Sequence, residues 1–486
     1  MAGRPTLIII DAVSLSERRS RASRSLIDYH CRVKKLLPLF VTALLVVPVA
    51  VETASKSVSR ITEASIRAHM EFLAGEALNG RGSGTRDEWI AAAYIGSQMR
   101  RWGIEPLGDD GGYVQDVHIE RSELSSPPVL SFEGRRLTHG KEIVVSRLGG
   151  AQLSGPLQRY SPGVPVAKGA VLLLPEGAAP PPAAETAAAA MILSAESEQA
   201  RTRRLAAPAR PLVIQHIADV PPRAAIALDS GSYAAVAALR DGAMVKVEAD
   251  AKPAVVAHTW NAIGRLTGST PAQAHDVILL TAHLDHLGNR APANGTDAAD
   301  TIYNGADDDA SGSIAVLELA ELLAKGKRPR RTIIFAWFGS EESGGAGASH
   351  FIDAPPVPLD TIVANLEFEM IGRADKAVPP HTLWLTGYER SNLGPALAKQ
   401  GAKIVADPHP EQNFFSRSDN IQLARRGVIA QTVSSFGLHT DYHQPSDEVK
   451  TIDFAHMTDS IRSMLSPVLW LANSRFRPEW LPGKKP

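Results

Sequence analysis

From Asn261 onward the chain alternates continuous apolar runs with segments of helical periodicity, and this alternation constrains the fold more than any other feature. Continuous apolar runs are typical of strands that are buried on both faces. Strands that alternate with helices predict a mostly parallel, mixed α/β sheet with helices on both faces. The predicted strands are DVILLTA (276–282), RTIIFAWF (331–338), TIVANLEF (361–368), TLWLTG (382–387) and GVIAQTVSSF (427–436), and the predicted helices are 311–326, 391–401 and 453–472.

The part of the chain before Asn261 has two different patterns. Residues 58 to 117 have helical periodicity, interrupted by the loop LNGRGSGT. Residues 126 to 257 contain short β-like runs around an Ala- and Pro-rich stretch, which predicts an inserted, smaller β-rich domain. A length of 486 residues agrees with more than one domain.

Residues 1–56 are predicted to be a targeting segment. Arg32, Lys34 and Lys35 directly precede the apolar stretch 36–51, which has the length of a signal-peptide core. The stretch falls just short of the ~17 to 25 residues of a membrane-spanning helix. We therefore expect a secreted or periplasmic protein. The alternative is a retained membrane anchor with an extracytoplasmic domain, and membrane contact is expected only in that case.

Charge and cysteine content exclude several classes of protein. The chain has 51 Lys plus Arg and 52 Asp plus Glu, so no overall field attracts nucleic acid, and we expect no nucleic-acid partner. Cys31 is the single cysteine, so the chain can build neither an internal disulfide nor a thiolate metal site.

Polar residues directly follow most of the predicted strands. Open α/β sheets bind ligands outside the carboxyl ends of their strands, so we expect these side chains to meet at one edge. The acidic group Asp307 to Asp309, which precedes a predicted helix, belongs to the same edge. One of these three acids has the alternative role of capping that helix. The other residues are His283, Asp285 and His286 after the first strand, Glu341 and Glu342 after the second, Glu369 after the third, and Tyr442 and His443 after the last.

Several carboxylates in one cleft are costly unless a positive charge compensates them. No Lys or Arg adjoins these motifs apart from Arg373, so bound cations are expected to supply that charge. Imidazole nitrogens and carboxylate oxygens without a thiolate favour zinc, with manganese or cobalt as alternatives. Two dications can coexist at about 3.5 to 4 Å only with anions around them, which agrees with two Zn²⁺ per chain.

The motifs themselves resemble a known family. AHLDHLG, NGADDDASG, GSEE, NLEFEMIGR and DYHQPSDE occur in the order typical of metallopeptidase family 28, which includes double-zinc aminopeptidases, glutamate carboxypeptidase-like enzymes and glutaminyl cyclases. The middle segment is similar in position to the protease-associated domain of many relatives. The resemblance implies a zinc exopeptidase-like fold, with a catalytic domain in two parts (57–125 and 258–475), an insertion (126–257) and a C-terminal tail (476–486).

The resemblance also implies a role for each matched residue. Two positions depart from the family pattern, namely Glu369, where Asp is usual, and Asp309, where Asn is common. His286 and His439 are additional histidines, and we expect them to be polar loop residues without a direct role. The implied metal ligands are His283, Asp308 as the bridge, Glu342, Glu369 and His443, and the implied catalytic residues are Glu341 as general base, Tyr442 as donor to the oxyanion and Asp285, which orients His283.

The function that follows is a dinuclear zinc aminopeptidase that acts on peptides. A carboxypeptidase or dipeptidase of the same family would need basic residues in its pocket, and Arg373 and Arg417 are the candidates. A glutaminyl cyclase is less favoured, because its single-zinc chemistry does not need the pair His283 and Asp285. A receptor or scaffold without metal on the same fold is the alternative from another class of protein, and the complete set of matched ligands argues against it.

Overall fold

A computed structural model describes residues 61–177, 188–197, 213–217, 222–290 and 300–486. The predicted targeting segment 1–56 lies outside these residues, so both it and the expected export stay predictions. Within the described ranges, no helix combines the length and the apolar character needed to cross a membrane.

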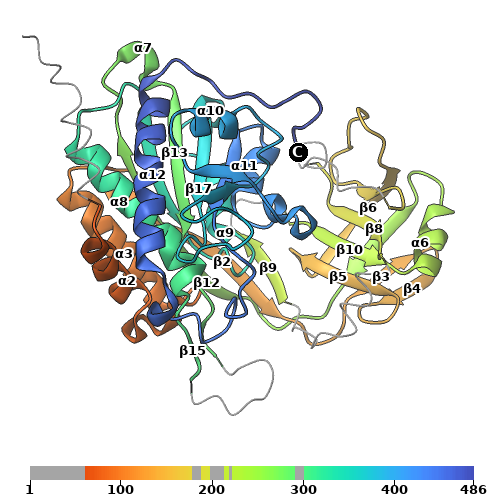
Figure 1. Cartoon of the computed structure of the whole chain (residues 1–486). Helices are drawn as coiled ribbons and strands as arrows, with labels where there is room; N and C mark the ends of the chain where they lie inside the picture. Colours follow the sequence, from red (N-terminus) through yellow and green to blue (C-terminus); the bar gives the residue numbers. More distant parts are fainter. Residues whose placement is uncertain (1–60, 178–187, 198–212, 218–221, 291–299) are drawn as a thin grey trace, which may run out of the picture. The chain divides into compact units, whose positions relative to one another are not determined.

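The larger of two main sheets has ten strands and a parallel centre (Figure 1). Its order is β19-β18-β20-β17-β13-β16-β12-β2-β9, and β1 pairs with β12. The pairs β17/β20, β13/β17 and β13/β16 are parallel, whereas β12 and β2 run antiparallel to their neighbours. The bounds are β1 Glu105–Pro106, β2 Val114–Glu123, β9 Val213–Ile217, β12 Val255–Leu266, β13 Val277–His283, β16 Thr332–Phe338, β17 Ile362–Phe368, β18 Leu383–Leu385, β19 Ile404–Ala406 and β20 Ala430–Ser434.

Helices cover both faces of this sheet, as the alternation of strands and helices predicted. Alternate residues of the central strands separate two cores: Ile278 and Leu280 face one, whereas Val277 and Leu279 face the other. The first core is closed by α2 (Glu63–Leu73), α3 (Arg86–Arg101), α8 (Gly312–Lys325), α10 (Leu393–Lys399) and α12 (Phe454–Asn473), and the second by α9 (Ala346–Asp353) and α11 (Asn420–Arg425) (Figure 1).

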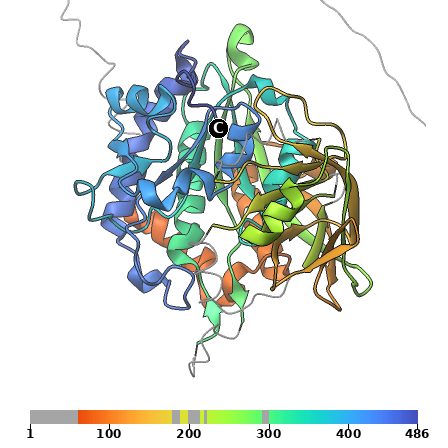
Figure 2. The same cartoon turned by 90° about the vertical axis from the view of Figure 1, so that its right-hand side faces the viewer.

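The second main sheet has eight strands, all from residues 129–248, in the order β4-β3-β11-β6-β7-β8-β10-β5. Helix α6 (Ser230–Ala237, light green in Figure 2) packs against its core. The bounds are β3 Val129–Phe132, β4 Arg135–Thr138, β5 Ile143–Leu148, β6 Gln152–Arg159, β7 Val171–Leu173, β8 Met191–Ala195, β10 Ala224–Leu228 and β11 Met244–Glu248.

Two strands of the larger sheet do not fit the predicted domain boundaries at residues 126–257 and 258–475. Strand β9 comes from within 126–257 but pairs with β2 at the edge of the larger sheet, and β12 begins before residue 258. The division of the chain into domains therefore stays a prediction. The helical pattern predicted up to residue 117 is wrong in its last part, because β1 and the start of β2 lie there.

Candidate metal centre

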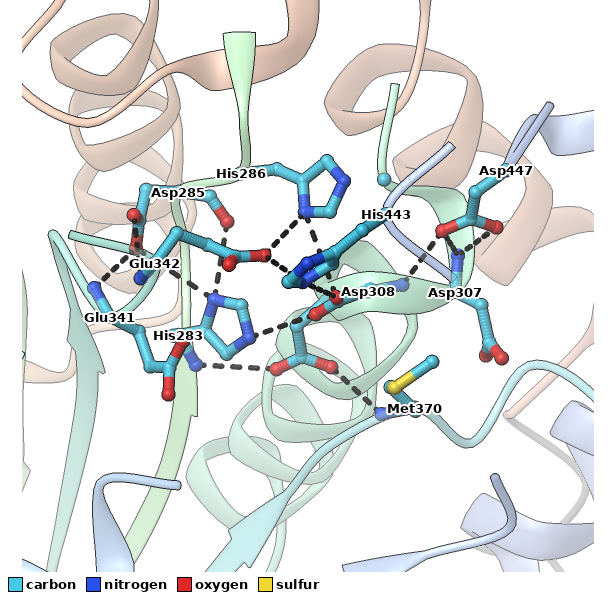
Figure 3. Close-up of polar contacts among 12 residues, drawn as sticks. His283, Asp285, His286, Asp307, Asp308, Glu341, Glu342, Met370, His443 and Asp447 are labelled. Atoms are coloured by element: carbon cyan, nitrogen blue, oxygen red, sulfur yellow. Dashed lines mark hydrogen bonds and ion pairs between the residues drawn. The ribbon is translucent and has the colours of Figure 1, made fainter. Parts of the chain in front are cut away.

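The carboxyl ends of the parallel strands bring the predicted polar residues to one edge of the larger sheet (Figure 3). His283 is the last residue of β13 and is level with Phe338, the last residue of β16. Glu341 and Glu342 follow β16, and Glu369 directly follows β17. The acids Asp307 to Asp309 lie in the irregular turn η3 (Ala306–Ser311), which leads into α8.

Asp308 lies between two sets of ligand atoms. Its Oδ1 is 3.1 Å from Nε2 of His283, and its Oδ2 is 3.2 Å from Nε2 of His443. Glu369 completes the first set, because its carboxylate, Asp308 and His283 have ligand atoms within 4.8 Å of one another. Glu342 completes the second, with Oε1 3.1 Å from Nε2 of His443. The two oxygens of Asp308 therefore face different groups, as a bridging carboxylate would.

His286 belongs to the second set, although it was expected to be a polar loop residue without a direct role. Its side chain is fully buried, and its Nδ1 lies 2.9 Å from Oε1 of Glu342 and 3.8 Å from Oδ2 of Asp308. Both rings, His286 and His443, thus approach the same two carboxylates (Figure 3). The spacing motif AHLDH places His286 three residues after His283, which is the only sequence signal that could have identified it.

Several of these atoms are buried without a hydrogen-bond partner. They include Nε2 of His283, both ring nitrogens of His286 and Oε1 of Glu342. A buried polar atom left unsatisfied costs about 1 to 3 kcal/mol, and more when it is charged. Imidazole nitrogens and carboxylate oxygens that face one another without hydrogen-bond geometry are satisfied by a divalent cation. The residues present therefore fit the metal that the sequence predicts.

The carboxylate of Asp285 holds the loop after β16, and its backbone carbonyl contacts the ring of His283. Its Oδ1 accepts the backbone N–H of Glu341 at 2.9 Å, and its Oδ2 accepts the hydroxyl of Ser83 at 2.5 Å. Its carboxylate is 3.7 Å from Nδ1 of His283, too far for a hydrogen bond. The backbone carbonyl of Asp285 lies closer to that nitrogen, at 3.2 Å. Asp285 thus positions both the imidazole, through its carbonyl, and Glu341, through its carboxylate.

The acids on either side of Asp308 bind backbone groups. Asp309 accepts the N–H of His283 at 3.2 Å, of Met370 at 3.1 Å and of Gly312 at 3.0 Å, so it links β13, the end of β17 and the start of α8. Asp307 accepts the N–H of Gly372 at 2.7 Å and contacts His439 Nε2 at 2.9 Å. The role of helix cap falls to Asp309.

Sequence analysis missed Arg81, a buried cation in the loop LNGRGSGT. Only 1% of its surface is exposed. Its guanidinium donates to the carbonyls of Leu284 at 3.0 Å, Asn304 at 2.7 Å and Gly305 at 3.0 Å, and also to that of Leu73. The bonds connect the end of β13, the approach to η3 and the end of α2. Nothing in the local sequence signals hydrogen bonds to residues 203 to 224 positions away.

Burial changes the pKa of most ionisable groups in the centre. It raises the pKa of Glu341 well above its usual value, and it raises that of Glu369 to about 7. Burial alone would lower the pKa of His443, but the hydrogen bonds that its ring donates to the carboxylates of Asp308 and Glu342 outweigh this effect and raise the pKa to about 9. Burial also raises the pKa of Tyr442, so its phenol stays a hydrogen-bond donor. The crowded carboxylates need positive charge nearby.

A pocket of about 480 Å³ opens onto the two ligand sets. Tyr442 lies in its wall and stacks on His443, with ring centroids 3.9 Å apart. Arg417 also lines the pocket, whereas Arg373 does not, because it pairs with Asp441 at 2.7 Å and Asp447 at 3.4 Å. The apolar part of the wall consists of Met370, Trp384, Phe414 and Phe436.

Comparisons with known proteins agree with this arrangement. The model of the family "Peptidase family M28" matches residues 261–467. Leucine aminopeptidase 1 of Colletotrichum graminicola is 25% identical over 232 residues, which cover 45% of this chain and 56% of the relative. An aminopeptidase of Pseudomonas aeruginosa is 34% identical over 115 residues, which cover 24% of this chain and 18% of the relative. The first match thus spans little more than half the length of that relative.

Among solved structures, the aminopeptidase from Aneurinibacillus sp. strain AM-1 is 17% identical with a TM-score of 0.48, over 86% of this chain and 96% of that one. The matched region 261–467 contains β13, β16, β17 and β20 and each of the predicted ligands. Residues 261–467 therefore match the model of peptidase family M28.

Proposed function

We propose that this protein is a dinuclear zinc aminopeptidase, which removes residues from the N-terminus of peptides. The observation that carries the proposal is the position of Asp308, whose two oxygens face separate sets of buried ligands at 3.1 and 3.2 Å. The relatives named above are aminopeptidases, which supports cleavage at the N-terminus of the peptide. His283 and Glu369 would hold one ion. Glu342 and His443 would hold the other, with His286 as a further candidate ligand beside them, and Asp308 would hold both.

When bound, the two ions polarise the scissile carbonyl and lower the pKa of a water molecule near them. Glu341 accepts the proton of the attacking water and delivers it to the leaving amine. Burial raises the pKa of Glu341 well above its usual value, which makes its carboxylate a stronger proton acceptor. The phenol of Tyr442 donates a hydrogen bond to the scissile carbonyl oxygen, which becomes an oxyanion as the water attacks.

The pocket is lined by four carboxylates, Asp308, Glu341, Glu342 and Glu369, and by the single guanidinium of Arg417. In the proposed centre Asp308, Glu342 and Glu369 hold the ions, which offset their charge. The choice of the peptide N-terminus is therefore carried by the relatives rather than by the charge of the lining. Arg417 is also the specific observation that favours the alternative, a carboxypeptidase or dipeptidase, because a guanidinium binds a peptide carboxylate well.

Glu341→Gln tests the mechanism. A general base typically raises the reaction rate by about 100- to 10,000-fold. Turnover should therefore fall by that factor, while the zinc content stays equal to that of wild type. Glu411→Gln, at an exposed glutamate, is the matched control and should keep full activity. Loss of zinc together with activity in Glu341→Gln would make Glu341 a ligand rather than the base.

Aminoacyl-nitroanilides and their N-acetylated counterparts test whether the enzyme requires a free N-terminus. Each substrate is assayed once with added zinc and once with a chelator. Activity on the free-amine substrates alone, abolished by the chelator and restored by zinc, is the expected result. A preference for peptides with a free C-terminus would instead support the carboxypeptidase. Activity that persists in the chelator would refute the metal-dependent mechanism itself.

A further inference from the structure

A second cluster of imidazole and carboxylate groups lies on strands β2 and β12, outside the centre described above. It consists of Asp116, His118 and His258, whose ligand atoms lie within 4.8 Å of one another. None of them belongs to the loops that carry Asp308 and its neighbours. We propose that these three residues form an additional zinc site.

The strand register brings the three side chains together. His118 and His258 are directly paired across the antiparallel β2 and β12, and Asp116 lies two residues before His118. Directly paired residues, and residues two apart, share one face of a sheet. On β2 the residues adjacent to His118, Val117 and Ile119, are fully buried, so the cluster occupies the opposite, partly exposed face.

The distances agree with ligands that share one metal ion. Nδ1 of His258 lies 2.9 Å from Oδ1 of Asp116, and Nε2 of His118 lies 3.4 Å from its Oδ2. Ligands of tetrahedral zinc, bound at about 2.0 to 2.2 Å, lie about 3.3 to 3.6 Å from one another, so the His118 distance matches this separation and the His258 distance is shorter. The two rings have centroids 4.6 Å apart at an angle of 60°, so neither blocks the other.

The environment holds these ligands while leaving room for water. Strands β2 and β12 are paired along the whole cluster. The backbone N–H of Asp116 donates to the carboxylate of Asp109 at 2.7 Å. The ring of His258 also stacks on Trp260, at 13° between planes. Side-chain exposures of 56% for His118, 38% for Asp116 and 37% for His258 leave one side open. Three protein ligands with an open fourth position are typical of zinc sites that also bind water.

The donor set selects the class of metal. Two imidazole nitrogens and one carboxylate oxygen suit zinc and its neighbours copper and nickel, whereas calcium and magnesium prefer oxygen ligands alone. Without metal, His258 forms an ordinary hydrogen bond with Asp116. The competing explanation is a metal-free cluster held by this hydrogen bond. The zinc content of the protein distinguishes a zinc site from such a cluster.

The test is zinc uptake by the full chain, measured against a chromophoric chelator after complete removal of metal. The variant His118→Ala/His258→Ala should bind one zinc equivalent fewer than wild type, and His275→Ala, at an exposed histidine on another element, should match wild type. Equal uptake by the double variant and wild type would overturn the proposal. Because the result is a difference, it does not depend on how many ions Asp308 and its partners bind.

Two further variants make the outcome independent of folding and of the proposed peptidase. Asp116→Asn has nearly the same shape and can still form the hydrogen bond to His258, but it removes the negative charge. This variant should weaken zinc binding at this site by about ten-fold or more. Asp308→Ala should lose zinc at the edge of the sheet yet keep the equivalent on β2 and β12. If Asp308→Ala binds no zinc while retaining the metal-free melting temperature of wild type, the additional site does not exist.

Discussion

Replacing Arg81 by alanine would test how the loop LNGRGSGT assembles the metal centre. Arg81 binds four backbone carbonyls, of Leu73, Leu284, Asn304 and Gly305, and no water can reach them through a residue that is 1% exposed. Leu284 directly precedes Asp285, and Gly305 lies three residues before Asp308. The variant removes every one of these bonds at once.

The expected loss follows from the number of carbonyls. A buried acceptor without a partner costs about 1 to 3 kcal/mol, so four give about 4 to 12 kcal/mol before the structure relaxes. Relaxation and entry of water reduce this sum, and we expect the free energy of unfolding to fall by about 4 kcal/mol. Domains have about 5 to 15 kcal/mol in total, so the variant would be close to unfolding.

The positive charge itself is not the source of this stability. Burial lowers the pKa of Arg81 to about 10, in spite of the nearby carboxylates of Asp285, Asp309 and Asp447. The charged form is thus less favourable inside the protein than in water, and the hydrogen bonds offset that cost. Arg81→Lys keeps the charge but has a single nitrogen, which cannot reach four carbonyls in different directions. We expect lysine to recover less than half of the loss.

Urea unfolding of the zinc-free chain provides the measurement, because bound metal would add its own stabilisation. Arg86→Ala, at an exposed arginine of the same segment, is the control and should change the free energy of unfolding by less than about 0.5 kcal/mol. If Arg81→Ala behaves like this control, or if lysine restores the wild-type value, the hydrogen bonds are not what holds the centre together.

Two other variants give independent tests. Burial raises the pKa of Glu318 to about 7 from 4.5, so the folded chain binds this proton more tightly and stability should fall by up to about 3 kcal/mol as the pH rises from about 4.5 to 7. Glu318→Gln should remove that part of the pH dependence in urea unfolding, and an unchanged slope would contradict it. Tyr442→Phe keeps the stacking on His443 but removes the donor, so kcat should fall by about 100- to 1,000-fold at wild-type zinc content. Wild-type turnover in this variant would exclude the phenol from the reaction.

The centre of the larger sheet could be predicted because its strands are buried on both faces. Burial on both faces requires continuous apolar residues, and the predictions 276–282, 331–338 and 361–368 fall within one residue of β13, β16 and β17. The antiparallel side could not be predicted in the same way. Strand β12 carries polar residues on both faces, namely the partly exposed His258 and the fully buried Asn261, so its apolar run is interrupted. Strand β9 joins the sheet through backbone pairing from within a segment of β-like runs.

The candidate site was predictable to the extent that it depends on strand ends. Parallel strands end at one edge, so His283, Glu342 and Glu369 had to lie near one another once the strands were known. His286 was underestimated because a residue three positions beyond a strand end has no fixed direction. In the folded chain the carbonyl of Arg81 accepts the N–H of His286 at 3.1 Å and so fixes the backbone at this position.

The three consecutive acids show why sequence alone could not assign the bridge by physical reasoning. Asp307, Asp308 and Asp309 have the same functional group, and their roles differ because of the backbone N–H groups that surround them. Asp309 faces three such donors and Asp307 faces Gly372, so each carboxylate is satisfied within the protein. The carboxylate of Asp308 faces the imidazoles of His283 and His443 instead. The acid that backbone donors leave unsatisfied is the one free to bind a cation, and only the folded backbone determines which acid that is.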